Sequence, residues 1–302
     1  MRLLVTGRDG QVAASLLAAG QARAGVRVAA IGRPELDLAR PDTIIDVIAG
    51  AKPDIVVSAA AYTAVDQAED EPDLAFAVNA TGAGKVAEAA ARLGVPVIHL
   101  STDYVFDGSK AGAYVEADPT APLGVYGASK LAGEQAVAAA NPRHLILRTA
   151  WVYSPFGKNF VKTMLRLAAD RDEISVVSDQ WGNPTSALDI ADAILHAAAV
   201  LHGDKSLARF GTYHLAGSDE TSWSGFARHI LDTSLKFGGP WARVRDITTM
   251  DYPTKAHRPA NSRLSSAKFA DAFGWTAPDW RMSTDEVVQR LLVGNTRQAL
   301  NP

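Results

Sequence analysis

The chain has 302 residues, of which 47% are hydrophobic and 21% charged, with a formal net charge of -3. These values indicate a globular chain of one large or two modest domains, without the basic character of nucleic-acid or anionic-membrane binding. The absence of cysteine excludes disulfides, thiolate metal sites and a cysteine nucleophile. With no signal-peptide pattern and no apolar run long enough for a membrane span, we expect a cytoplasmic protein without membrane or nucleic-acid partners.

The first predicted strand, residues 2–6, runs directly into a glycine turn. Gly7, Gly10 and Ala13 have the spacing G-x-x-G-x-x-A, and an alanine- and leucine-rich helix follows. Glycines let the backbone approach a pyrophosphate, whose charge is favoured at a helix N-terminus. A tight strand-to-helix connection would use the same residues, but the position after the first strand favours cofactor binding. The residues expected to bind the cofactor here are Gly7, Gly10, Gln11 and Val12.

A second predicted strand, residues 26–31, ends next to Arg33. An acidic residue at such a strand end binds the ribose hydroxyls of NAD, whereas an arginine suits a 2′-phosphate. We therefore predict NADPH as the cofactor and leave open that NADH is also accepted; a surface arginine without a ligand is the competing interpretation. Asp37 could reach the edge of the adenine ring, and we expect both Asp37 and Leu38 to contact the cofactor.

The third predicted strand, residues 54–58, is almost continuously apolar, as a parallel sheet covered on both faces requires. Small side chains at its carboxyl end would let a flat cofactor lie against the backbone, although plain packing explains them equally. The cofactor residues expected here are Ala59, Ala60, Ala61 and Tyr62. A predicted helix over 72–93 carries Asn79, which either ties a fourth strand, residues 95–101, to the active site or is simply exposed.

Tyr126 and Lys130 lie four positions apart in a predicted helix and therefore share one face. There the ammonium could lower the pKa of the phenol and make it a proton donor near neutrality. Thr102 or Ser101, at the end of the fourth strand, could hold a substrate oxygen beside that phenol. The spacing alone recurs by chance, but with a dinucleotide-type turn and a hydroxyl-ended strand it favours carbonyl reduction by hydride from a cofactor.

A fifth predicted strand, residues 144–148, completes five alternations of strand and helix. This order predicts an α/β fold with a Rossmann-type, doubly wound parallel sheet and a smaller C-terminal α/β domain for the substrate. A sixth strand at 174–177 and a helix at 187–201 are expected to return to the first domain. The first domain is therefore predicted as residues 1–148 with 174–202, and the second as residues 149–173 with 203–302.

The sequence resembles the extended short-chain dehydrogenase/reductase superfamily and, within it, the dTDP-4-dehydrorhamnose reductases. The matching segments extend over almost the whole chain: residues 7–11, 59–66, 101–106, 125–134, 148–153, 159–164, 179–185 and 258–264. The related nucleotide-sugar 4,6-dehydratases carry Asp-Glu directly after the active-site threonine, whereas here Asp103 is followed by Tyr104. The resemblance therefore implies reduction of a ketone with release of oxidised cofactor, and not an elimination.

The resemblance also implies roles for individual residues. The hydride of NADPH would go to C4 of dTDP-4-dehydro-L-rhamnose while Tyr126 protonates the oxygen, Lys130 grips the nicotinamide ribose and Thr102 hydrogen-bonds the C4 oxygen. Arg258 and Arg263 flank a loop with room for a nucleotide diphosphate, unless ion pairs simply hold a surface loop there. The residues expected to contact the substrate are Thr63, Val65, Thr102, Asp103, Tyr126, Trp151, Arg258, Asn261 and Arg263. The cofactor residues expected besides those of the first three strands are Ser101, Tyr126 and Lys130.

Some members of this family dimerise around magnesium held by glutamates. The matching positions here are Ser15 and Leu188, neither of which suits a hard cation, although Asp189 lies beside the second. We therefore predict no metal site and leave open a homodimer that is not bridged by magnesium. Two other functions also stay open: another sugar-nucleotide reductase or epimerase, and a non-catalytic NADP-binding regulatory subunit.

Overall fold

The fold is taken from a computed structural model, which describes residues 1–203 and 206–299. Residues 204–205 and 300–302 of the expected C-terminal domain lie outside the described residues. The strands are β1 (Arg2–Thr6), β2 (Arg27–Ile31), β3 (Ile55–Ser58), β4 (Val97–Thr102), β5 (His144–Thr149), β6 (Val152–Tyr153), β7 (Glu173–Val177), β8 (Trp181–Gly182), β9 (Thr185–Ser186), β10 (Gly211–His214), β11 (Thr221–Ser222) and β12 (Arg243–Ile247). The α-helices are α1 (Gln11–Gln21), α2 (Ile44–Ala51), α3 (Val65–Ala68), α4 (Pro72–Phe76), α5 (Ala83–Arg92), α6 (Val125–Ala140), α7 (Phe160–Asp170), α8 (Ala187–Gly203), α9 (Trp223–Lys236), α10 (Ala267–Phe273) and α11 (Trp280–Ala299).

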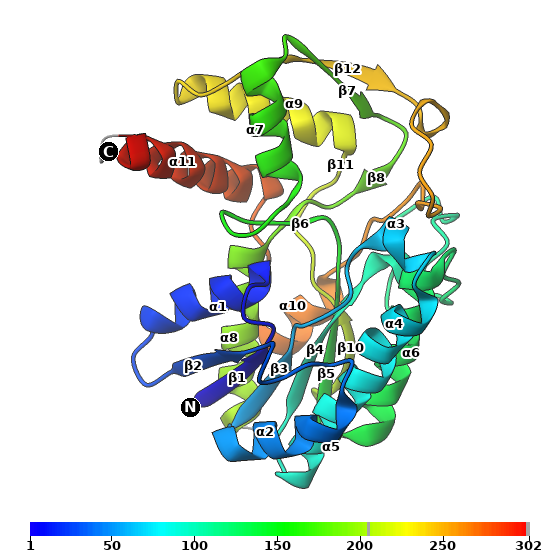
Figure 1. Cartoon of the computed structure of the whole chain (residues 1–302), viewed down its shortest axis with the longest axis vertical. Helices are drawn as coiled ribbons and strands as arrows, with labels where there is room; N and C mark the ends of the chain where they lie inside the picture. Colours follow the sequence, from blue (N-terminus) through cyan, green and yellow to red (C-terminus); the bar gives the residue numbers. More distant parts are fainter. Residues whose placement is uncertain (204–205, 300–302) are drawn as a thin grey trace.

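A parallel sheet in the order β10-β5-β4-β3-β1-β2 forms the centre of the lower part of the molecule (Figure 1). Helices α1, α8 and α10 pack on one face of this sheet, and α2, α5 and α6 cover the other. The predicted doubly wound α/β fold is therefore confirmed. The strand order reverses between β1 and β3, and ligands of such sheets bind at this kind of switch point.

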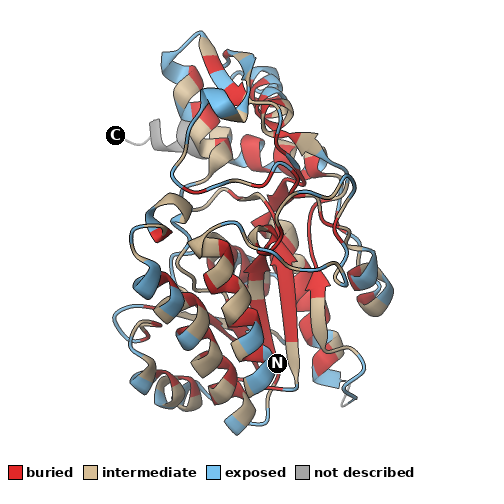
Figure 2. Cartoon of the chain, turned by 90° about the vertical axis from the view of Figure 1, so that its right-hand side faces the viewer, coloured by how far each residue is buried: buried red, intermediate tan, exposed pale blue. Residues whose placement is uncertain are grey.

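The apolar character of the central strands follows from this double coverage. All four residues of β3 are buried, as are five of the six in β4 and β5. Figure 2 shows the strands as a buried layer between helices whose outer faces are exposed. Burial on both faces removes the polar alternation of a half-exposed strand, which explains the continuous apolar runs in the sequence.

The expectation that residues 174–177 return to the main sheet is wrong. This segment forms β7, which pairs with β12 in a separate two-stranded sheet, while β10 is the sixth strand of the main sheet. In β7, Ile174 and Val176 are buried and Ser175 is exposed, the alternation of a strand covered on one face only. The expected helix at 187–201 does pack against α1 as α8.

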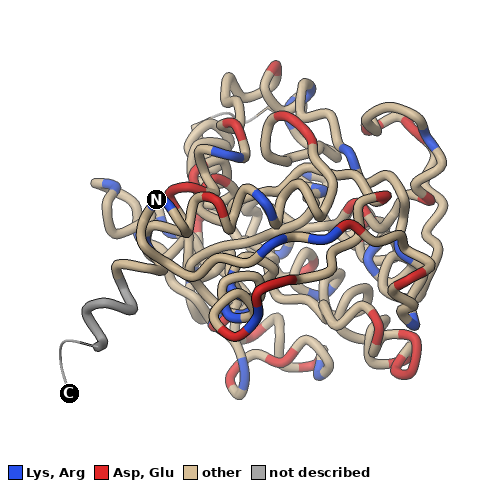
Figure 3. The backbone as a smooth tube through the Cα atoms, turned by 90° about the horizontal axis from the view of Figure 1, so that it is seen from above, with Lys and Arg blue, Asp and Glu red and all other residues tan. Residues whose placement is uncertain are grey.

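The upper part of the molecule has its own core. It is formed by α7, α9, α11 and β7 around the aromatic side chains of Tyr153, Phe226 and Trp280 (Figure 1). Acidic and basic residues are interspersed along the backbone when the molecule is seen from above (Figure 3). Within residues 1–203 and 206–299, no helix combines the length and hydropathy needed to cross a membrane.

Candidate active site

A cleft of about 880 Å³ lies at the carboxyl ends of β1 to β4. The segments after these strands, the first half of α6 and a stretch after β5 line it together. All the residues expected to bind the cofactor are among the lining residues, namely Gly7, Gly10, Gln11, Val12, Arg33, Asp37, Leu38, Ala59, Ala60, Ala61, Tyr62, Ser101, Tyr126 and Lys130. Folding thus brings into one cavity four strand ends that are far apart in the sequence.

The turn after β1 has the shape that a phosphate-binding backbone requires. Gly7 has φ of 96°, and a Cβ there would lie 3.2 Å from Ala60. Helix α1 follows with Gly10 as its N-cap and without a side-chain cap, so its first amides have no side-chain acceptor. A helix N-terminus of this kind, next to a close backbone approach, suits the diphosphate of a dinucleotide.

Two arginines lie at the end of the cleft formed by β1 and β2. Arg33 is exposed and, among the described residues, has neither a hydrogen bond nor an ion pair. Arg8, which the sequence reasoning missed, also lines the cleft and pairs with Glu35 at 2.9 Å. Asp37 accepts a hydrogen bond from the Ala39 amide at 3.0 Å and so closes a local turn.

Thr102 and Tyr126 meet where β4 approaches the N-terminus of α6. The Thr102 hydroxyl is near enough to the Tyr126 phenol to lower its pKa, and it donates a hydrogen bond to Asp103 Oδ1 at 3.0 Å. Helix α6 starts beside Glu69, whose carboxylate accepts a hydrogen bond from the Val125 amide at 2.8 Å. A carboxylate at this helix end stabilises the turn that carries Tyr126.

The expectation that Lys130 lowers the pKa of Tyr126 is wrong in this structure. Burial raises the pKa of the Tyr126 phenol above its ordinary value, the Thr102 hydrogen bond partly opposes this, and the charge of Asp103 adds to it. Lys130 donates instead to the Leu100 carbonyl at 2.6 Å. Burial lowers the pKa of Lys130 to about 8, against the opposing charge of Glu134.

Behind Lys130, a buried polar network ties α6 to β4 and β5. Glu134 accepts hydrogen bonds from Arg148 at 2.9 and 2.7 Å and from the Ser101 hydroxyl at 2.5 Å. Both members of the ion pair are almost completely buried. A buried charge without its partner is costly, so this network fixes the helix that carries Tyr126 relative to the strand that carries Thr102.

Asn79 lies in a π-helical turn, η2 (Ala77–Gly82), that interrupts the helix predicted over 72–93. Its side chain is buried, accepts a hydrogen bond from the Tyr62 amide at 2.8 Å and donates to Ser129 at 2.9 Å. Both alternatives given for Asn79 are therefore wrong: it is buried rather than exposed, and it joins the segment after β3 to α6 rather than tying the fourth strand. A π-turn inside a helix is frequent at functional sites.

Asp103 is a buried carboxylate next to the phenol. Only 3% of its surface is exposed, and burial raises its pKa to about 6, against opposing hydrogen bonds from Ser262 and Thr102. Within the described part of the chain, its Oδ2 has no hydrogen-bond partner within normal distance. Neither Asp103 nor Thr102 is among the residues that line the cleft.

Fewer of the expected substrate residues than of the expected cofactor residues line the cleft. Only Thr63 and Tyr126 line the cleft itself. Val65 begins α3 nearby. Trp151 has φ of 48° and stacks on Trp223 with ring centroids 3.7 Å apart.

Residues 254–263 form a loop, called the 254–263 loop below, whose polar side chains mostly hydrogen-bond or pair with other groups of the protein. Arg258 pairs with Asp66 at 2.8 Å. Asn261 is buried, and its amide donates to the carbonyls of Lys110 and Gly112 at 2.6 and 2.9 Å. Arg263 donates to Asn261 Oδ1 at 2.7 Å and pairs with Glu220 at 2.8 Å. Neither Asn261 nor Arg263 is brought to the cleft.

The sequence reasoning also missed a set of lining residues from the end of β5 and the segment after it. These are Thr149, Val152, Gly157 and Lys158. Thr149 and Val152 belong to a matched segment, so the signal was present but not used. Lys158 is exposed and lies in a loop without a recognisable motif, so only its proximity to the glycine turn identifies it.

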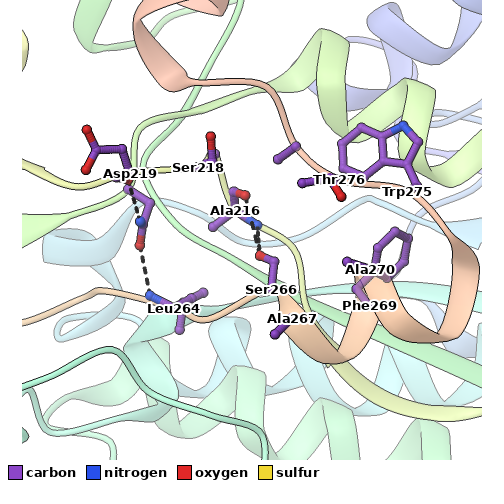
Figure 4. A pocket seen from close by; sticks show the side chains of 13 residues that line it. Ala216, Ser218, Asp219, Leu264, Ser266, Ala267, Phe269, Ala270, Trp275 and Thr276 are labelled. Carbon is purple, nitrogen blue, oxygen red and sulfur yellow. Dashed lines mark hydrogen bonds between the residues drawn. The ribbon is translucent and has the colours of Figure 1, made fainter.

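A second, smaller pocket of about 260 Å³ lies beside α10, and none of the expected site residues line it (Figure 4). Its polar groups bind one another: Asn183 accepts a hydrogen bond from the Leu264 amide at 2.8 Å, and Ser266 accepts one from the Ala216 amide at 3.0 Å. These bonds hold the chain segments that pass between β10, α10 and the upper core.

Comparison with known proteins shows which family the chain belongs to. Residues 1–293 match the family described as "RmlD substrate binding domain". A dTDP-4-dehydrorhamnose reductase of Sinorhizobium fredii is 54% identical over 97% of this chain and 98% of its own length. The crystal structure of a dTDP-4-dehydrorhamnose reductase from Clostridium acetobutylicum superposes with a TM-score of 0.89 at 34% identity, covering 97% of this chain and 100% of that one.

The enzyme of the same name from Bacillus anthracis, solved in complex with NADP, superposes with a TM-score of 0.85 at 34% identity. That match covers 95% of this chain and 98% of the other. Family match, sequence identity and superposition thus agree over nearly the whole length of the chain. The chain belongs to the RmlD substrate binding domain family, together with the dTDP-4-dehydrorhamnose reductases that it resembles.

Proposed function

We propose that this chain reduces the C4 ketone of dTDP-4-dehydro-L-rhamnose to the alcohol of dTDP-L-rhamnose, with NADPH as the hydride donor. The observation that carries the proposal is the presence of Tyr126, Lys130 and Ser101 in one cleft with the glycine turn. The names of the relatives support the substrate, and the NADP complex of the Bacillus anthracis enzyme supports the cofactor. When bound, NADPH supplies a hydride to C4.

In this proposal, the backbone after β1 and the first turn of α1 hold the cofactor diphosphate. The fit rests on Gly7, where a side chain would press against Ala60, and on the uncapped N-terminus of α1. Arg33 pairs with the 2′-phosphate, because it lines the cleft without a protein partner in the described chain. Lys130 hydrogen-bonds the nicotinamide ribose.

Tyr126 donates its phenolic proton to the oxygen at C4. A raised pKa keeps the proton on the phenol until that oxygen gains negative charge and becomes the stronger base. Thr102 turns its hydroxyl proton from Asp103 toward the same oxygen and stabilises the developing charge. With a hydride supplied by the bound cofactor, the proton from Tyr126 would complete the reduction of the carbonyl to the alcohol.

The sugar nucleotide is proposed to lie between the cleft and the upper core. Asp103 accepts a hydrogen bond from a sugar hydroxyl through Oδ2, and Trp151 packs on the sugar with Thr63 and Val65 nearby. Arg258 exchanges Asp66 for the diphosphate. Asn261 and Arg263 serve the site indirectly by holding the 254–263 loop in place.

We also propose that any homodimer forms without bridging magnesium. Ser15 is buried and donates to the Gln11 carbonyl at 2.8 Å, while Asp189 accepts a hydrogen bond from Ser283 at 2.5 Å. The cytoplasmic location stays a prediction. Because β7 lies outside the main sheet while β10 belongs to it and α10 packs on it, we propose that the first domain comprises residues 1–149, 187–203, 206–214 and 267–273.

The decisive test measures loss of NADPH absorbance with enzymatically generated dTDP-4-dehydro-L-rhamnose, for the wild type and for Tyr126→Phe. Turnover by the wild type and its loss in the variant support the proposal. Tyr114→Phe, which removes a buried hydroxyl outside the cleft, is the matched control. NADPH binding without turnover by the wild type would leave a regulatory subunit, and tightly retained NAD without net turnover would indicate an epimerase.

A further inference from the structure

His99 lies in the middle of β4, is completely buried and contacts Lys130. Its Nε2 is 3.5 Å from Lys130 Nζ, and its Nδ1 is 3.1 Å from the Ser58 hydroxyl on the adjacent strand β3. Among the described residues, the only other hydrogen-bond partner of Lys130 is the Leu100 carbonyl at 2.6 Å. The ammonium therefore has two partners on β4 and one N–H group left over.

The chemistry of these partners determines the tautomer of His99. An ammonium only donates hydrogen bonds, so Nε2 must be the acceptor and Nδ1 must carry the proton. That proton is donated to Ser58 Oγ. Burial and the charge of Lys130 hold the pKa of His99 well below its ordinary value, so the ring stays neutral.

We infer that His99 is a positioning residue for Lys130: its neutral ring, locked in one tautomer by Ser58, holds two N–H groups of the ammonium on β4 and leaves the third for the cofactor ribose. The inference rests on the proposed function of Lys130. His99 itself touches neither cofactor nor substrate, because it does not line the cleft.

The charged surroundings of Lys130 make this support important. Glu134 acts on it from its own helix, on which Tyr126 lines the same cleft; His99 contacts it from β4, and Arg148 from β5 pairs with Glu134. Asp103, after β4, acts on Tyr126. Burial lowers the pKa of Lys130 to about 8, so the loss of one acceptor brings deprotonation into the working pH range.

The first experiment compares His99→Leu, which removes the acceptor, with His99→Gln, whose amide oxygen can replace Nε2. Because a hydrogen bond to a charged group is lost, the alkaline limb of NADPH binding and of kcat/KM should move down by about one pH unit in His99→Leu. The limb should stay near the wild-type position in His99→Gln. Ser58→Ala should cause a smaller shift in the same direction, because it releases the tautomer.

His144→Gln is the control for the loss of a histidine far from Lys130, because His144 begins β5 at the end remote from the cleft. It should leave the pH profiles of NADPH binding and of kcat/KM unchanged. An unchanged alkaline limb in a folded His99→Leu protein would overturn the inference, since a purely structural histidine would lower stability without moving the limb. Nitrogen NMR of the wild type provides a test that does not depend on any variant folding. It should show a neutral ring with the proton on Nδ1, and a proton on Nε2 would overturn the inference.

These readouts separate the inference from the function on which it rests. If the wild type binds NADPH without reducing dTDP-4-dehydro-L-rhamnose, the proposed function fails. The ring tautomer and the pH dependence of NADPH binding would then still decide the role of His99.

Discussion

The cations of the cofactor cleft and those of the 254–263 loop differ in their partners. In the cleft, Arg8 is paired with Glu35, but Arg33 and Lys158 have no hydrogen bond or ion pair in the described part of the chain. In the loop, Lys255, Arg258 and Arg263 are each paired with a carboxylate. An anion that enters the cleft meets unpaired cations, whereas an anion that approaches the loop must displace a protein carboxylate.

This difference shows how the two regions are stabilised. The cleft is built from strand ends and a helix N-terminus, whose positions the sheet and its buried core determine. The loop has only isolated backbone hydrogen bonds to Trp181 and Tyr114, so side-chain pairs contribute much of what holds it in place. Charged residues in such a loop are therefore shared between structure and ligand binding, and their motif alone does not separate the two roles.

The largest effect is expected in the cleft, from removal of the proton donor. Tyr126→Phe should lower kcat about a thousandfold, because general acid catalysis is lost, while the Kd for NADPH stays within a factor of two or so. Stopped-flow turnover and fluorescence titration measure the two quantities. If Tyr126→Phe keeps its activity, Tyr126 is not the proton donor and the reaction does not depend on this part of the cleft.

The next effect concerns the support of the cleft. Arg148→Met should lower the free energy of unfolding by about 3 kcal/mol, because Glu134 is then buried without its partner. The double variant with Glu134→Gln should recover part of this loss. Urea unfolding measures the stability of the single and the double variant. If Arg148→Met is as stable as the wild type, the buried Arg148–Glu134 pair does not stabilise the cleft.

A pH-dependent effect is expected at Asp103. Because its pKa is raised to about 6 in the folded protein, its contribution to stability is fully present below the unfolded pKa of 3.8 and is lost as pH rises through about 6. Asp103→Asn should therefore stabilise the protein by about 1 to 3 kcal/mol near pH 8 and have little effect near pH 4. Urea midpoints that shift equally at both pH values would show that burial does not perturb this carboxyl.

The two arginines of the loop should respond differently. Arg258→Gln should raise KM for the sugar nucleotide about tenfold, because a phosphate partner is lost. Arg263→Gln should instead lower the unfolding free energy by about 1 kcal/mol and leave KM nearly unchanged, since its partners belong to the protein. The opposite pattern would assign the ligand contact to Arg263.

The smallest effect is expected for cofactor selection. Arg33→Ala should lower the ratio of kcat/KM for NADPH over NADH roughly fivefold, because an exposed ion pair contributes at most about 1 kcal/mol. Arg27→Ala, at the exposed opposite end of β2, is the matched control. An unchanged ratio in Arg33→Ala would mean that Arg33 does not contact the 2′-phosphate.

Several features of the site followed from the sequence because they depend on local pattern. The glycine turn, the hydroxyl-ended strand and Tyr126 with Lys130 have fixed spacings within one element or one connection. A parallel sheet places all such strand ends at one edge, so recognising the strands was enough to assemble these residues. Asn79 and Arg8 were missed or misassigned because their roles depend on partners from other segments.

The sequence by itself determined the alternation of strands and helices, the residues at each strand end and the family to which the chain belongs, because these depend on periodicity and on local motifs. Only the tertiary structure decided that β10 rather than β7 completes the sheet, that Lys130 donates to β4 rather than acting on the phenol, and that Arg263 is paired. The physical reason is that strand partners, desolvation and ion pairs are properties of contacts between distant segments, which no local pattern of residues specifies.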